Sequence, residues 1–404
     1  MRGVPRASQR LAIVVTLSAG AFVATSTSIG VAPFLLDIAR DLQVDLPAAG
    51  NLVALQNLSW GAASVFAGTL SDRLGRRPIL STALVILAVS SIGVARADSY
   101  AWVAFWRVVG GFGGGAYMGT VFATVSDQFP PAERGRSLGW VVTGQSLSLV
   151  VGVPLMTLAG AAAGWRGAVL AQGLVLISGA AAIWQTVPRR PARAAEQPIP
   201  LGSVVRLIGP RVIALLLANT AERLCYSALA VFLPTYLLTR YALSPAELAI
   251  GLALVAIGNL VGNVVGGQLT DRLRARQLFA AATLALAGLV SLPVLIWSPA
   301  LAVSVALGFV YTFVNAAGRP GLLAVLSDVS TQARGAVLGL NITFSSFGWL
   351  AATAVGGWLV GGYGFGALGV LTCCVAIVGG VLAAATWLVP ARAPRLVVAA
   401  HERT

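Results

Sequence analysis

Charged residues are scarce in this sequence. Only 10% of its 404 residues are Asp, Glu, Lys or Arg, whereas 57% are hydrophobic. A soluble domain carries about 25% charged residues. A chain this long and this apolar does not hide its hydrophobic surface in one water-soluble core, so lipid must be the solvent for most of it. The composition therefore excludes an ordinary soluble protein.

Histidine and cysteine are nearly absent. His401 is the only histidine and lies in the C-terminal tail, which excludes a histidine-based metal centre or proton relay. Cys225, Cys373 and Cys374 fall within apolar stretches, and their spacing indicates neither a disulfide framework nor a zinc site. The chain contains no phosphate-binding loop of an ATP-driven pump and no nucleophile–base pair. We therefore expect no metal, no cofactor and no enzymatic activity.

Long apolar stretches occur twelve times, each close to the roughly 20 residues that cross a bilayer. The sequence predicts an all-α polytopic membrane protein with spans near residues 12–36, 48–70, 78–95, 101–126, 138–162, 167–187, 211–238, 246–269, 278–297, 300–326, 336–360 and 367–389.

Lysine is missing altogether, so all 27 basic residues are arginines and the net charge is +14. Twenty arginines fall on the side of the N-terminus, four (Arg40, Arg96, Arg166 and Arg240) on the other side, and three within spans. The positive-inside rule places the arginine-rich side in the cytoplasm. We expect a multi-pass protein of the cytoplasmic (inner) membrane with both termini cytoplasmic, lipid as its surroundings, and no nucleic-acid partner.

The two halves of the chain repeat each other at a spacing of about 200 residues. Pro33 is matched by Pro234, and the stretch from Gly68 to Arg73 by the stretch from Gly267 to Arg272. Asp127 and Arg134 are matched by Asp328 and Arg334, and Gly164-Trp165 more loosely by Gly364-Phe365. This duplication predicts two pseudo-twofold-related six-helix bundles, at residues 1–187 and 211–404, joined by a cytoplasmic linker at 188–210.

A charged loop between the second and third spans is the most specific motif. Its glycines permit a tight turn, and its arginines are able to bind carboxylates such as Asp127. For an isolated loop of this kind, a solvated charged turn is the simpler interpretation. The repeat favours a cytoplasmic gate instead, composed of Gly68, Asp72, Arg73, Gly75, Arg76, Arg77, Asp127, Arg134, Asp271, Arg272 and Asp328.

This loop resembles motif A of the major facilitator superfamily. Arg107 with the glycines at 111–115 resembles the family's motif B, and Gly152-Val-Pro154 resembles part of its antiporter motif C. Within the superfamily the chain looks most like the twelve-span drug:proton antiporters, which include sugar and nucleoside efflux permeases. The resemblance implies the major facilitator fold and alternating access.

Polar residues within the spans are functional candidates because they are costly in lipid. In the seventh span, Asn219, Glu222, Arg223 and Tyr226 share one helical face, with Glu222 roughly 16 Å deep. In the tenth span, Tyr311, Asn315 and Arg319 share another face, and Gly318-Arg319-Pro320-Gly321 predicts a broken or kinked helix.

Two interpretations of these faces stay open. In the first, Glu222 and Arg319 line a central cavity and Glu222 is the main protonatable group. In the second, Glu222 forms a structural pair with Arg319 or Arg223 that only compensates buried charge. Three intramembrane arginines against one glutamate leave two surplus positive charges, which weakly favours anionic cargo.

The first half offers fewer candidates. Arg107 either orders its helix or contacts substrate. Asn57 and Gln145 either line the cavity or bond neighbouring helices, as polar residues in spans more often do.

The leading function is secondary active export of a small organic solute, in exchange for protons, by a monomer. An uptake carrier or facilitator for a small metabolite, including an anionic one, is the alternative. A lipid-handling membrane protein is the alternative from a different class.

Overall fold

The computed structural model describes residues 7–189, 209–297, 300–328 and 334–388, and within them it contains helices and no strands. The first half comprises α1 (Ala7–Ile29), η1 (Ala32–Phe34), α2 (Leu35–Asp41), α3 (Leu46–Leu74), α4 (Arg76–Arg96), α5 (Tyr100–Gln128), α6 (Pro131–Leu147), η2 (Ser148–Gly152) and α7 (Val153–Thr186). The second half comprises α9 (Pro210–Arg240), α10 (Pro245–Arg272), α11 (Arg276–Ile296), α12 (Leu301–Asp328), α13 (Arg334–Tyr363) and α14 (Phe365–Leu388). The predicted linker at 188–210 lies mostly outside the described residues, so the proposed domain limits stay a prediction.

The helices are long enough to cross a bilayer. Nine stretches of the described chain combine sufficient length with sufficient hydropathy, and one of them, Ser137–Thr186, is 50 residues long. That stretch reverses direction at Gly164, which has a φ of 70°, so it supplies two spans. The nine stretches therefore supply ten spans. The 29-residue α3 and the 30-residue α13 supply the other two, so all twelve predicted spans have a helix in the structure.

Glycine makes two chain reversals at positions that the sequence repeat pairs. Gly164 and Gly364 both have positive φ angles, 70° and 79°, and each separates two consecutive spans. Side chains rarely adopt this conformation, whereas glycine does so without steric cost. The looser sequence match between these two corners therefore corresponds to one shared backbone turn.

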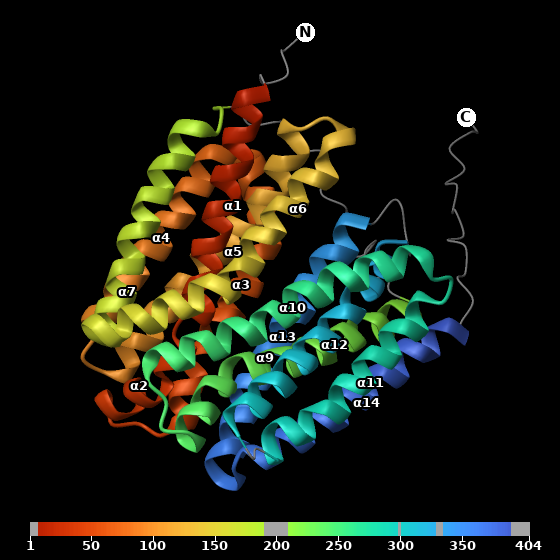
Figure 1. The fold of residues 1–404 in the computed structure, drawn as a ribbon. Helices are drawn as coiled ribbons and strands as arrows, with labels where there is room; N and C mark the ends of the chain where they lie inside the picture. The colour runs from red at the N-terminus through yellow and green to blue at the C-terminus, as the bar shows by residue number, and fades with distance from the viewer. Residues whose placement is uncertain (1–6, 190–208, 298–299, 329–333, 389–404) are drawn as a thin grey trace, which may run out of the picture.

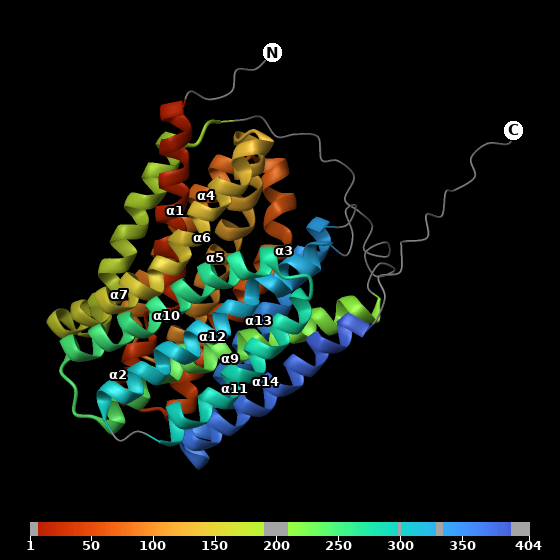
Figure 2. The ribbon, with the colours of Figure 1, turned by 45° about the vertical axis from the view of Figure 1, so that its right-hand side comes forward.

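The two halves form two helical bundles that Figures 1 and 2 show side by side, α1–α7 in red to yellow and α9–α14 in green to blue. Equivalent helices pack in equivalent ways: α3 packs on α5 and α10 packs on α12. Between the bundles, α3 packs against α13, and α7 with η2 packs against α10. The structure thus has the predicted pseudo-twofold arrangement.

Closely packed glycines hold these helix pairs together. In the first bundle, Cβ atoms placed at Gly111 and Gly115 of α5 would lie within 2.3 Å of backbone carbonyls of α3. In the second, Gly262 and Gly266 of α10 meet carbonyls of α12 equally closely. Gly111 and Gly115 of α5 and Gly262 and Gly266 of α10 are therefore packing surfaces within the two bundles.

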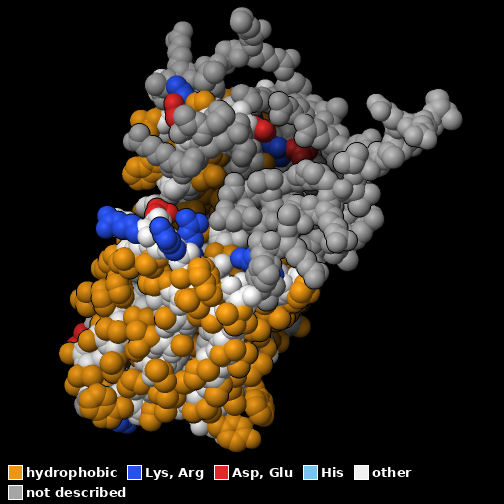
Figure 3. Space-filling view, turned by 90° about the vertical axis from the view of Figure 1, so that its right-hand side faces the viewer, with side chains coloured by type: hydrophobic (Ala, Val, Ile, Leu, Met, Phe, Trp, Pro, Cys, Tyr) orange, Lys and Arg blue, Asp and Glu red, His pale blue; other side chains and the backbone are white. Residues whose placement is uncertain are grey.

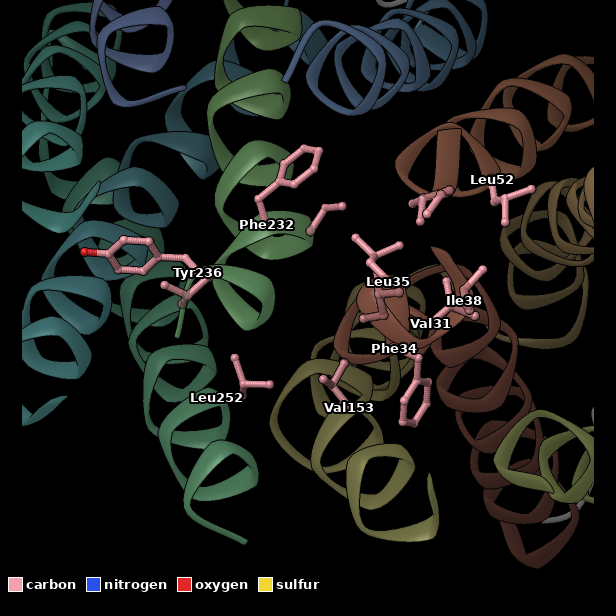
Figure 4. Close-up of a cluster of buried hydrophobic side chains, with 14 of the residues drawn as sticks. Val31, Phe34, Leu35, Ile38, Leu52, Val153, Phe232, Tyr236 and Leu252 are labelled. Atoms are coloured by element: carbon pink, nitrogen blue, oxygen red, sulfur yellow. The ribbon is translucent and has the colours of Figure 1, made fainter. Parts of the chain in front are cut away.

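The hydrophobic cores connect the bundles on one side of the membrane. We call the side on which α1 begins the arginine-rich side; its described basic residues are Arg10, Arg73, Arg76, Arg77, Arg189, Arg211, Arg272, Arg274 and Arg276. One large core on the opposite side takes residues from both bundles, among them Phe34, Leu35 and Val153 from the first and Phe232 and Leu252 from the second. Figure 4 shows these side chains converging from both bundles.

Toward the arginine-rich side, each bundle has its own core. One cluster lies within the first bundle and includes Leu17, Leu84 and Tyr117. Another lies within the second bundle and includes Leu215 and Leu322. Among the described residues, no hydrophobic cluster joins the bundles there.

The outer surface suits a lipid environment. Large apolar side chains such as Phe66, Leu254 and Val381 are exposed on the helices. Figure 3 shows a broad hydrophobic face of the molecule with a group of basic side chains along one border. Apolar exposure on this scale is stable where lipid tails cover it.

Candidate functional site

A buried ion pair occupies the middle of α9. Glu222 and Arg223 are 1% and 5% exposed, and the Arg223 guanidinium donates to both carboxylate oxygens of Glu222. At about 1.5 Å per residue, Glu222 lies roughly 18 Å from Pro210 and 27 Å from Arg240 along the helix. The pair lies between the core that both bundles share and the separate core of the second bundle.

Aromatic and polar neighbours fix the pair in place. Arg223 lies over the ring of Tyr226, 4.9 Å from its centroid, and Tyr226 packs edge-to-face on Trp349 of α13 at 5.9 Å. One turn toward the arginine-rich side, the Asn219 amide donates to Ser345 Oγ at 2.8 Å, again on α13. The predicted polar face of α9 is thus directed at α13, and Trp349 is a component that the sequence reasoning missed.

The polar face of α12 adjoins the same cluster. The Tyr311 hydroxyl donates to the Cys225 carbonyl at 2.6 Å, which fixes this face against α9. Asn315, one turn on, is 1% exposed, and neither atom of its amide has a hydrogen-bond partner among the described residues. Arg319 follows after another turn, half-buried, and interacts electrostatically with Arg223, Glu222 and Tyr226.

The structure decides between alternatives at two points that involve α12. The helix is not broken at the Gly-Arg-Pro-Gly sequence: it continues through Pro320 to Asp328. Neighbouring helices in a packed bundle compensate for the hydrogen bond that a proline removes. Of the two pairings considered for Glu222, the structure has the one with Arg223, which donates to both carboxylate oxygens, and no ion pair joins Glu222 to Arg319.

Arg107 is held without any carboxylate. Its guanidinium donates to the carbonyls of Thr27 and Ser28 at 2.8 and 3.1 Å and to the Leu52 carbonyl at 3.0 Å. Thr27 and Ser28 lie in the last turn of α1, where carbonyls lack helical partners and carry partial negative charge. Arg107, 4% exposed, therefore ties α5 to α1 and α3, and the end of α1 compensates its charge.

The other candidates of the first bundle differ in their contacts. Asn57 accepts a hydrogen bond from Ser28 Oγ at 3.0 Å and donates to the Val53 carbonyl at 2.9 Å, so it joins α3 to α1. Gln145 is half-buried on α6, and its backbone carbonyl accepts from Ser148 Oγ at 2.6 Å. Neither side chain hydrogen-bonds to Glu222 or Arg223 in the part of the chain that the structure describes, and a role in binding stays a prediction for both.

The charged loop after α3 is closed by the pairing that the sequence suggested. Gly75, with a φ of 94°, is the single residue between α3 and α4. It turns the chain so that Arg76 Nε donates to Asp127 Oδ2 of α5 at 3.0 Å, while Arg76 also bonds Asp72 and Ser71. Arg77 lies over the Trp184 ring at 4.4 Å. These contacts stay within the first bundle.

The second copy of this loop is more open. Three residues separate α10 from α11 where Gly75 alone serves in the first copy, and the position of the glycine is taken by Arg274. Asp271 and Arg272 are exposed. The surroundings of Gly68 and the side chains of Arg134 and Asp328 are not among the described parts of the structure, so the role of these residues in the gate stays a prediction.

One backbone feature of the fifth span was not anticipated. Between α6 and α7, residues 148–152 form a π-helical turn in which the Val153 amide donates to the Ser148 carbonyl, five residues back. Pro154 follows, and its missing N–H and bulky ring disfavour regular α-helical bonding here. Such turns are frequent at functional sites, and this one packs against α10 of the other bundle. In the sequence, Pro154 was the one residue that could have indicated this irregular turn.

A shallow depression lies on the side of the molecule opposite the arginine-rich side, and its charged residues bind one another. It is lined by Asp37, Arg40, Asp41 and residues 163–166. Arg166 donates to Asp41 at 2.9 Å and to the carbonyl of Ala97 at 2.6 Å, and it lies over the Trp165 ring. Arg166 thus joins α7 to the end of α2 and to the loop between α4 and α5.

The fold and its mid-membrane polar cluster define the protein as a polytopic α-helical membrane protein. The family model of the Major Facilitator Superfamily matches residues 17–221 and 215–403. The chain therefore belongs to this superfamily, and it is a membrane transporter rather than an enzyme.

Relatives and solved structures agree with this assignment. The chain is 26% identical to the MFS-type transporter YbcL of Bacillus subtilis, over 84% of this chain and 88% of that one. It is 26% identical to the chloramphenicol resistance protein of Streptomyces lividans, over 65% and 68% of the two chains. A bacterial homolog of the human lysosomal transporter Spinster, in an inward-facing and occupied conformation, shares the fold with a TM-score of 0.75 at 15% identity, over 95% of both chains.

Proposed function

We propose that this transporter exports a small organic solute across the cytoplasmic membrane by alternating access, in exchange for protons. The buried Glu222–Arg223 pair in the middle of α9 is the observation that carries this proposal. The chain acts as a monomer whose partners are the solute, protons and the surrounding lipid.

The arginine distribution supports an orientation. By the positive-inside rule, the arginine-rich side faces the cytoplasm, together with both termini. The hydrophobic core shared by the bundles then lies toward the outside. With the bundles joined on the outer side, a solute would reach the central site from the cytoplasm, which is the loading state of an exporter.

Protonation of Glu222 supplies a coupling step. A buried ion pair becomes costly when one partner loses its charge, because the other is left uncompensated. The groups that face Glu222 are Arg223, Cys225 and Tyr226 on α9 and Tyr311 and Arg319 on α12. A proton on Glu222 would release Arg223 and favour rearrangement of α9 against α12 and α13.

Export is favoured by one relative, whose name describes resistance to chloramphenicol. Uptake of a small metabolite on the same architecture is the second candidate. Lipid handling is the candidate from another class. The exposed apolar surface alone does not favour it, because every polytopic membrane protein has such a surface.

The test begins with a thermal-shift screen of the purified protein against drugs, sugars, nucleosides and organic acids, because a ligand that binds the folded state raises apparent stability. The stabilising solute is then followed in proteoliposomes with an imposed pH gradient. We expect flux of the wild-type protein to follow the gradient and flux of Glu222→Gln to become independent of it. Asp98→Asn, which removes an exposed carboxylate between α4 and α5, is the control.

Wild-type flux that ignores the gradient would remove proton coupling. Unchanged pH dependence in Glu222→Gln would remove Glu222 as the coupling carboxylate. Accumulation of the solute on the cytoplasmic side, against its own concentration gradient, would favour uptake instead of export.

A further inference from the structure

The three arginines buried within the membrane are compensated unequally. Arg107 is satisfied by the end of α1 and by the Leu52 carbonyl. Arg223 is satisfied by both oxygens of Glu222. Arg319 forms no hydrogen bond or ion pair with any described residue. The central site therefore carries one surplus positive charge, and that charge is at Arg319.

Glu222 does not pair with this charge. Both oxygens of its carboxylate accept hydrogen bonds from Arg223, and no ion pair joins it to Arg319. A half-buried guanidinium in this position is costly unless an anion or a set of acceptors meets it.

Asn315 provides a second, independent indication of a ligand. Its side chain is one turn from Arg319 on the same face of α12, close enough for both to contact one small group. It is buried, yet its amide nitrogen and oxygen both lack a partner among the described residues. Buried amides without a partner are rare, because a buried donor or acceptor that forms no hydrogen bond destabilises the folded protein.

We propose that Arg319 and Asn315 form an anion-binding subsite that receives the carboxylate of a small organic monoanion. The guanidinium fork matches a planar carboxylate in a bidentate manner, and the Asn315 amide adds a further donor. The Asn315 oxygen accepts from a hydroxyl group of the cargo or from water. One surplus charge selects a monoanion over a dianion.

The apolar part of the cargo has a surface nearby. Tyr226, within electrostatic range of Arg319, packs edge-to-face on the half-buried Trp349. Aromatic side chains of this kind bind apolar or aromatic bodies. The inferred cargo is a carboxylate attached to such a body. This inference rests on the proposed transport function in one respect: it assumes that the transported solute binds at the central site.

The test measures binding to the full-length protein in detergent by titration calorimetry, without any transport step. The probes are benzoate, the neutral isostere benzamide, and the cation benzyltrimethylammonium. We expect benzoate to bind and the other two not to bind. Arg319→Gln should weaken benzoate binding by about 10- to 100-fold and Asn315→Ala by about fivefold. Arg319→Lys should retain part of the affinity.

Arg240→Gln, an exposed arginine at the far end of α9, is the charge-matched control and should leave binding unchanged. Thermal melting without ligand shows whether each variant is folded. If Arg319→Gln does not fold, Asn315→Ala and Arg319→Lys decide the question.

Equal binding of benzoate and benzamide, preference for the cation, or benzoate binding that survives in Arg319→Gln would each overturn the proposal. Arg319-dependent binding of phosphatidylglycerol in place of benzoate would overturn the soluble carboxylate as cargo. Benzoate binding together with flux that ignores a pH gradient would leave the subsite intact and remove only proton coupling.

Discussion

Arg76, the first residue of α4, donates through Nε to Asp127 near the end of α5 at 3.0 Å, and the two side chains are 13% and 22% exposed. This bond fixes the turn at Gly75 against a helix that is more than 50 residues away in sequence.

Asp127→Asn should lower the free energy of unfolding by about 1 kcal/mol, because the pair is charged but partly exposed to solvent. Arg76→Gln should cost somewhat more, since Arg76 also bonds Asp72 and Ser71. The measurement is the melting temperature of the purified variants in one detergent. The double variant should be less destabilised than the sum of the single variants.

Arg272→Gln in the exposed second copy of the loop is the matched control and should change stability by less than about 0.5 kcal/mol. Equal losses of stability from Arg76→Gln and Arg272→Gln would contradict the inference that the first copy of the loop is closed by its ion pairs and the second is not.

Replacing either reversal glycine should destabilise the fold through the backbone alone. Cβ atoms placed at Gly164 and Gly364 would meet no neighbour within 4 Å, so only their positive φ angles oppose a side chain. Gly164→Ala and Gly364→Ala should each cost about 1–3 kcal/mol. Thermal melting is again the measurement.

Gly139→Ala is the control, because Gly139 is equally open but lies within helix α6. It should be neutral or stabilising, since alanine favours a helix over glycine by about 0.5–1 kcal/mol. Similar melting temperatures for all three variants would refute the backbone argument.

Arg107→Lys should reduce stability by about 3 kcal/mol. Arginine reaches three carbonyls on two helices with a planar fork, whereas an ammonium group meets fewer of them. Any residual transport should keep the cargo preference of the wild type, because the Arg107 guanidinium is occupied by three backbone carbonyls. The melting temperature and the relative uptake rates of two cargoes check these two points; altered preference would place Arg107 in the binding site.

The shared core on the side opposite the arginines should separate during transport. The backbones of Pro47 on α3 and Gly357 on α13 approach so closely that a Cβ at Gly357 would lie 3.1 Å from Pro47 Cα. The two Cα atoms are therefore well inside the roughly 7 Å beyond which two cysteines cannot be bridged. Oxidised Pro47→Cys/Gly357→Cys should stop transport in proteoliposomes, and reduction should restore it.

The two cysteines are introduced into a Cys374→Ser variant. Cys374 is exposed and could itself be oxidised, whereas Cys225 and Cys373 are buried. Each single-cysteine variant should be insensitive to oxidant. Full transport by the cross-linked double variant would show that the bundles need not separate at this point.

Much of this architecture was decided by local properties of the sequence. Apolar runs and arginine placement marked the spans, because transfer of a helix into lipid depends on its own composition. The 200-residue repeat marked the paired bundles and the shared glycine corners. The partner of Arg76 was also predictable, since a tight turn and a nearby carboxylate leave few alternatives.

Only the tertiary structure decided how the buried charges are shared. Helix rotation and packing bring Arg107 to the carbonyls at the end of α1, give Glu222 to Arg223 rather than to Arg319, and keep α12 continuous through Pro320. The π-helical turn before Pro154 likewise depends on the neighbouring helices. Which acceptor a buried donor finds depends on distances of a few ångströms between helices, and hydropathy and spacing do not contain those distances.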